Sequence, residues 1–152
     1  MLEAVEQLPL AQFLRRDLFA YPIVNALHIL ALAVLFTTAL LMDLRILGLG
    51  NRLDLKAVID TLRPLAVGSF GVAVLTGVLL FIVQPLHYAP NPVFWSKIVL
   101  VGLAFANAGY FVLARRHLDP GSSRTRLSAV MSILLWTAAI LAGRAIGYFG
   151  SE

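Results

Sequence analysis

Four stretches of the sequence are almost continuously apolar, and each is long enough to cross a bilayer as a helix. About 20 apolar residues are needed for one crossing. The stretches cover residues 21–47, 62–86, 92–114 and 127–149. Because the connections between them are short, the pattern predicts an all-α integral membrane four-helix bundle that forms one domain over residues 21–150.

Residues 1–20 follow a different pattern, in which apolar positions alternate with charged ones. Leu2, Val5 and Leu8 stand among Glu3 and Glu6. This is typical of an amphipathic segment that lies in the membrane interface. The sequence therefore predicts a short N-terminal interfacial helix before Pro22 turns the chain into the bilayer. A solvated tail with some helix is the alternative interpretation.

The composition agrees with a membrane protein and excludes an ordinary soluble domain. The 152 residues are 60% hydrophobic and 13% charged, with a mean hydropathy of +0.87. The net charge of +4 arises from basic residues that flank the spans, so the expected partner is the lipid bilayer and no nucleic acid. The absence of cysteine excludes disulfides, thiolate metal sites and thioether-linked haem.

Basic residues in the first and third loops predict the orientation. The first loop region holds Arg45, Arg52, Lys56 and Arg63, and the third holds Arg115, Arg116, Arg124 and Arg126. The positive-inside rule places both loops in the cytoplasm. Both termini are then expected in the periplasm, with the protein in a bacterial inner membrane, although Arg15 and Arg16 before the first span argue the other way.

Polar residues at the head of the first span are the first candidates for chemistry. Tyr21, Asn25 and His28 are spaced by four and three residues, which places them on one helix face. At 1.5 Å per residue, His28 lies roughly 10 Å below the start of the span. Because an ionisable group in a bilayer is costly, His28 is expected to be functional.

Other polar residues are expected at the same depth. Lys97 and Trp95 lie near the outer start of the third span, Arg144 lies within two turns of the outer end of the fourth, and His87 lies in the loop between the second and third spans. Under the predicted topology, these groups converge on one layer in the outer leaflet.

Three interpretations of His28 remain open. A neutral imidazole is a good axial ligand for haem iron, and Lys or Arg near the surface would neutralise the haem propionates. Imidazole also binds copper, but the chain has no cysteine and its three methionines are scattered. Alternatively, His28 and Asn25 form interhelical hydrogen bonds that fix the register of the bundle.

The remaining polar residues have simpler expectations. His87 is expected to be a solvated interfacial residue rather than a second metal ligand. Asp43 and Arg45 are expected to form a local surface pair. Thr76 and Asn107 are expected to bond to neighbouring backbone carbonyls.

Three segments, "ALHILALAVLFTTALLMDLRILGL", "LRPLAVGSFGVAVLTGVLLF" and "VFWSKIVLVGLAFANAGYFVLARRHL", carry a family resemblance. Their order resembles that of the HemJ family of bacterial membrane protoporphyrinogen oxidases, over residues 25–118. A similar plan occurs in the membrane domains of the CopD copper-resistance family and in a family of small four-helix bacterial membrane proteins. The similarity to HemJ implies that His28 binds haem b and that Lys97 is functional.

The chain departs from the HemJ pattern at two places. It reads "ILGLGN" where HemJ has an aromatic-His element after its first-helix Arg. It offers Asn107 or Tyr110 where the third helix of HemJ carries a His. These departures bear on the oxidase activity, whereas a haem site on His28 does not depend on them.

The leading hypothesis is therefore a haem b-binding membrane protein of electron transfer or membrane-associated oxidation, which as an enzyme would be a HemJ-like oxidoreductase. His28 would be the axial ligand, Lys97 and Arg144 would neutralise propionates or an anionic substrate, and Tyr21, Asn25 and Trp95 would orient the imidazole and shape the pocket. His87 is the weaker candidate for a second ligand. The alternatives are a non-catalytic accessory subunit of a larger membrane complex or homo-oligomer, and a copper-handling membrane protein.

Overall fold

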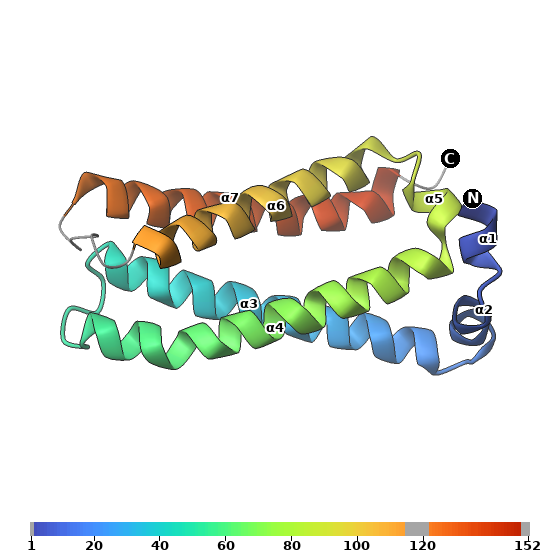
Figure 1. Cartoon of the computed structure of the whole chain (residues 1–152), viewed down its shortest axis with the longest axis horizontal. Helices are drawn as coiled ribbons and strands as arrows, with labels where there is room; N and C mark the ends of the chain where they lie inside the picture. The colour runs from blue at the N-terminus through green and yellow to red at the C-terminus, as the bar shows by residue number, and fades with distance from the viewer. Residues whose placement is uncertain (1, 115–121, 150–152) are drawn as a thin grey trace.

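The computed structural model describes residues 2–114 and 122–149, and these residues form helices without any strand (Figure 1). The helices are α1 (Leu2–Glu6), α2 (Pro9–Arg16), α3 (Ala20–Ile46), α4 (Leu55–Val83), α5 (Pro85–Tyr88), α6 (Pro92–Ala114) and α7 (Ser123–Phe149). Of these, α3, α4, α6 and α7 are long and apolar enough to cross a membrane. The predicted all-α membrane bundle is confirmed, and the protein is a multi-pass membrane protein.

The four long helices form two hairpins. Helix α3 packs along α4, α6 packs along α7, and the hairpins approach each other most extensively between α3 and α7. Figure 1 shows the hairpins farther apart at the α5 end than at the end with the α3–α4 turn. Stacked rings bridge α4 and α6, with centroids 5.1 Å apart for Phe70 and Phe105 and 5.4 Å apart for Phe81 and Phe94.

A small apolar core joins the hairpins near the middle of the bundle. It consists of Leu35 on α3, Ala104 on α6 and Trp136 on α7, and Phe70 packs against it with its ring edge-on to Trp136. Many other large apolar side chains are exposed, among them Val67 and Leu141. Such outward-facing apolar side chains are expected where the surrounding solvent is lipid.

Local sequence signals explain where α4 begins and ends. It begins at Leu55 rather than at residue 62, because the Asp54 side chain accepts a hydrogen bond from the Ala57 amide at 2.8 Å and caps the helix. The preceding turn uses Gly48 and Gly50 with positive φ. Pro85 opens the separate short helix α5 just beyond Val83.

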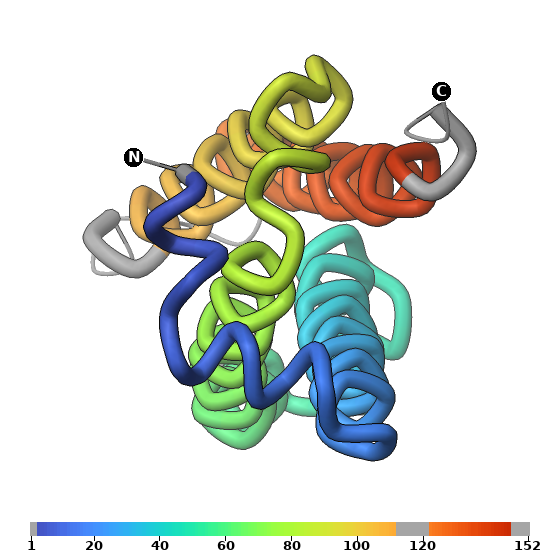
Figure 2. The backbone as a smooth tube through the Cα atoms, turned by 90° about the vertical axis from the view of Figure 1, so that its right-hand side faces the viewer, coloured from blue at the N-terminus to red at the C-terminus, as the bar shows by residue number. Residues whose placement is uncertain are grey.

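The N-terminal segment forms two short helices rather than one, because Pro9 starts α2 and holds Leu8 in an extended conformation with ψ of 139°. Together these helices cross the end of α3 and α4 beside α5 (Figure 2). Arg15 fastens the segment: its guanidinium pairs with Glu6 at 2.7 Å and donates to the Val83 carbonyl at the end of α4. A cation at this position complements the negative end of the α4 dipole.

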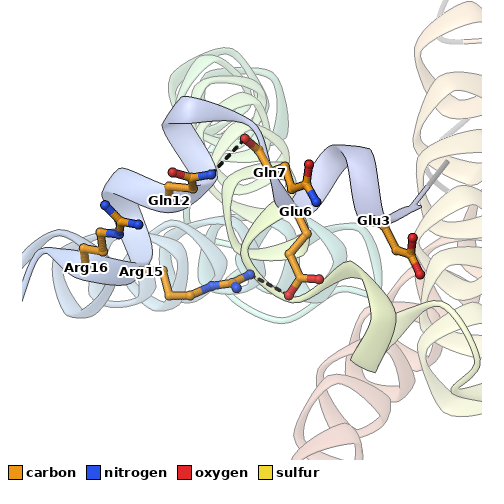
Figure 3. Close-up of a pocket in the computed structure, with 6 residues that line it drawn as sticks. All are labelled: Glu3, Glu6, Gln7, Gln12, Arg15 and Arg16. Carbon is orange, nitrogen blue, oxygen red and sulfur yellow. Dashed lines mark hydrogen bonds and ion pairs between the residues drawn. The ribbon is translucent and has the colours of Figure 1, made fainter.

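A polar cavity of about 420 Å³ lies between α1 and α2. Its lining residues are Glu3, Glu6, Gln7, Gln12, Arg15 and Arg16. Figure 3 shows Arg15 reaching Glu6, and Gln12 bonding to the Gln7 carbonyl at 3.2 Å. The interactions within this cavity hold α1 against α2. They therefore help to keep residues 2–16 in place on the bundle.

We expect Arg15→Gln to loosen residues 2–16 from the bundle, with a loss of up to about 1 kcal/mol because the ion pair is partly exposed. Faster amide hydrogen exchange in α1 and α2 would measure this loosening. Arg16→Gln is the matched control, since Arg16 lines the same cavity without a hydrogen bond or ion pair to another described residue. Equal exchange in both variants would contradict the fastening role of Arg15.

Candidate functional site

His28 lies at the interface of α3 and α4, in the half of the bundle nearest α5. Its Nδ1 atom is 2.9 Å from the Thr76 hydroxyl oxygen on α4. The same oxygen is 2.6 Å from the Val72 carbonyl and 3.2 Å from the Ala73 carbonyl. The imidazole and Thr76 therefore form one hydrogen-bonded group with the backbone of α4.

These distances determine which nitrogen of His28 carries the proton. Two oxygens 2.6 Å apart need a proton between them, and only the Thr76 hydroxyl can supply it, since the Val72 carbonyl has none. The Thr76 oxygen must then accept its bond from His28, so Nδ1 is the protonated nitrogen. Nε2 consequently keeps its lone pair, which is the form of imidazole that binds a metal.

Gly77 leaves room for the imidazole. A Cβ at this position would lie 3.2 Å from Cε1 and 3.7 Å from Nδ1 of His28. The Cε1–Nδ1 edge of the ring thus faces α4, and a side chain at position 77 would have to displace the imidazole by a few tenths of an ångström. Nε2 lies farther from Gly77, beyond 4 Å of the same Cβ position.

Lys97 approaches the same region from the other hairpin. Its side chain packs on Gly143 of α7, where a Cβ would lie 3.4 Å from Nζ. The lysine is close enough for its charge to act on His28. Within the part of the chain that the structure describes, no carboxylate pairs with Lys97. A membrane-embedded cation of this kind suits an anionic ligand group.

Aromatic side chains close the end of the bundle beside this pair. Phe81 of α4, Tyr88 of α5 and Phe94 of α6 pack together with ring centroids 5.4 to 6.4 Å apart. Tyr21, at the start of α3, lies near enough to Tyr88 to act on its phenol. Burial of the phenol and the neighbouring Tyr21 raise the pKa of Tyr88, which keeps the ring cluster uncharged at neutral pH.

The structure brings some of the predicted site residues together and separates others. Lys97 lies near enough to His28 for its charge to act on the imidazole, and Tyr21 lies near Tyr88 of the aromatic cluster. Asn25 and Arg144 have exposed side chains. Their exposure places neither side chain in the interior with the imidazole.

The other two predicted residues lie at the α5 end. Trp95 is exposed and donates its indole N–H to the Ala89 carbonyl at 2.9 Å, which orders the α5–α6 turn. His87 is exposed on α5 with its ring edge-on to Tyr88. Among the described residues, no group of three or more metal-ligating side chains forms, so His28 stands as a single imidazole.

Sequence reasoning missed Thr76 as the partner of His28. It expected Thr76 to bond to a backbone carbonyl, which is correct, but the hydroxyl also accepts from the imidazole. Gly77 and Gly143 were also missed as the positions that make room for His28 and Lys97. The sequence did contain a signal for these contacts: Gly77 lies at the depth of His28 and Gly143 lies at the depth of Lys97.

We expect Gly77→Ala to destabilise the protein by about 1–2 kcal/mol, because the added methyl group would press on the imidazole and its bond to Thr76. Gly68→Ala is the matched control on the same helix, since its Cβ would meet no atom within 4 Å. The control should be neutral or gain up to about 1 kcal/mol from helix propensity. Thermal unfolding in detergent measures both, and equal stability of the two variants would contradict the packing of His28 on Gly77.

Comparison with known proteins identifies the family of the chain. No curated protein and no solved structure matches the chain. A family model does match, over residues 18–149, which include the four long helices and both His28 and Lys97. The chain therefore belongs to the family described as a family of unknown function, DUF6644.

Proposed function

We propose that this protein binds haem b through His28 and takes part in electron transfer or in oxidation of a substrate within the membrane. The observation that carries the proposal is the hydrogen bond from His28 Nδ1 to Thr76, which leaves Nε2 free as a ligand. In haem proteins a second hydrogen bond to the ligating imidazole fixes its tautomer and ring orientation. Thr76 would have this role here.

One imidazole and one cation would hold a haem with one protein ligand. His28 supplies one imidazole, and Lys97 supplies a positive charge on the opposite hairpin without a carboxylate partner among the described residues. A propionate would satisfy that charge. When bound, a haem would supply one-electron transfer or oxidation chemistry to the membrane interior.

The side chains around the imidazole would control access to it. Gly77 allows close approach of α3 and α4 at His28. The aromatic cluster of Phe81, Tyr88 and Phe94 would limit the entry of water from the α5 end. The resemblance to the HemJ family in the segments around His28 and Lys97 would imply the same assignment.

The proposal includes an orientation. The basic residues of the α3–α4 turn, Arg45 and Arg52 among them, favour the cytoplasmic side for that end. The His28 end and both termini would then face the periplasm of a bacterial inner membrane.

The competing function is that of an accessory subunit in a larger membrane complex. The specific observation in its favour is the same His28–Thr76 bond, because an interhelical hydrogen bond between membrane helices can fix register without any cofactor. The two functions differ in one measurable property, since only the first gives a coloured protein.

Absorption spectra of the purified protein, oxidised and reduced with dithionite, test the proposal. We expect the Soret and α bands of haem b in the wild type after expression with adequate haem supply. His28→Ala should abolish these bands. Thr76→Val should weaken haem retention about 10- to 100-fold, whereas Thr76→Ser should retain it because the hydroxyl is kept.

His87→Ala is the matched control, because it removes an exposed imidazole at the same end of the bundle. It should retain the bands. A colourless wild type, or equal loss of haem in His28→Ala and His87→Ala, would reject His28 as the haem ligand.

A further inference from the structure

A second cavity lies between the four membrane-spanning helices, in the half of the bundle away from His28. Its volume is about 480 Å³. Asp43, which lines it, follows His28 by 15 residues on α3, or about 22 Å along the helix axis. His28 does not line the cavity, and its nearest lining residue on α3, Leu35, lies about 10 Å from His28 along the helix axis.

The walls of this cavity are mainly apolar and aromatic. Leu35, Phe70, Phe105 and Trp136 contribute, and the stacked rings of Phe70 and Phe105 form part of the lining. The volume falls in the usual range for small-molecule sites, about 300–1,000 Å³. Aromatic walls favour a flat ring as ligand, since stacked or edge-on rings attract one another.

A buried carboxyl group lies in the same cavity. Asp43 is 8% exposed, and the Ser132 hydroxyl of α7 is within hydrogen-bonding reach of it. Its Oδ2 atom has no hydrogen-bond partner in the described part of the chain. An unsatisfied buried oxygen of this kind calls for a missing partner.

The expected surface pair of Asp43 and Arg45 is wrong. Arg45 instead donates to the Leu53 carbonyl at 2.8 Å and to the Asn51 side chain at 3.2 Å, which orders the α3–α4 turn. Asp43 faces the opposite way, into the bundle, because α3 continues as a helix through both residues and turns them about 200° apart.

A cation and an amide from two other helices complete the polar lining. Arg63 of α4 lines the cavity without a hydrogen bond or ion pair to another described residue. Asn107 of α6 donates to the Ser128 carbonyl of α7 and accepts from the Ser128 hydroxyl, both at 3.0 Å. Each of the four spans thus contributes a polar side chain to one mainly apolar cavity.

We propose that this cavity binds a neutral, lipid-soluble aromatic ring with oxygen substituents, the chemical class of quinols and quinones. A quinol hydroxyl would donate to Asp43, or a quinone carbonyl would accept from the protonated carboxyl group, and Arg63 would donate to a second ring oxygen. Because a carboxyl and a guanidinium group line the same cavity, a ligand with a charged polar group would be repelled by one of them. A neutral polar group that donates and accepts hydrogen bonds can pair with both. The proposal does not depend on haem binding.

Tryptophan fluorescence gives a direct test, because the chain has two tryptophans and only Trp136 lines the cavity. In a Trp95→Phe background, Trp136 is the sole reporter. Titration with decylubiquinone in detergent should quench it saturably. With Trp136→Phe, the exposed Trp95 should show only weak quenching that rises linearly with quinone.

Asp43→Asn in the Trp95→Phe background should weaken the binding at least tenfold. Asp17→Asn is the matched control: it removes the same charge at the other end of the bundle and keeps the oxygen that caps α3. Linear quenching of equal strength at both tryptophans would overturn the proposal, and so would equal affinity of the two Asp variants. If Asp43→Asn does not fold, the difference in quenching between Trp136 and Trp95 still tests whether the cavity binds the quinone.

Discussion

The structure depends on how polar side chains are satisfied inside a bundle surrounded by lipid. The bond between His28 and Thr76 is the clearest case, because it joins α3 to α4 and at the same time determines the protonated nitrogen of the imidazole. The Thr76 hydroxyl also donates a hydrogen bond to the Val72 carbonyl in the backbone of α4. The pair therefore needs no water, and it leaves one nitrogen lone pair available for a ligand.

The same constraint divides the bundle into three levels. Near α5, the charge of Lys97 acts on His28 from the other hairpin, and at the other end Asp43 and Arg63 line the second cavity. Between them lies an apolar cluster in which Trp136 packs with Leu35 and Ala104, and Leu35 and Trp136 also form part of the wall of the second cavity. This separation allows each polar level to have its own ligand chemistry within one small bundle.

The spans were predictable because hydrophobic length is a strong signal, and depth alone placed His28 and Lys97 in the same half of the bundle. Helix rotation was not predictable. A span that is apolar on all sides has no preferred face, so spacing put Asn25 beside His28 although its side chain is exposed. Asp43 was misjudged for the same reason, since only packing against α7 shows that it faces inward. The end of α4 was also missed, because Pro85 can either continue or restart a helix.

The measurement that tests the central claim most directly is nitrogen NMR of the protein with ¹⁵N-labelled histidine, with His28 assigned by its loss in His28→Ala. The account predicts that His28 is a neutral imidazole protonated at Nδ1, and that Thr76→Val removes this preference while Thr76→Ser keeps it. A His28 protonated at Nε2 in the wild type would contradict the account, because the nitrogen assigned to the ligand would then carry the proton.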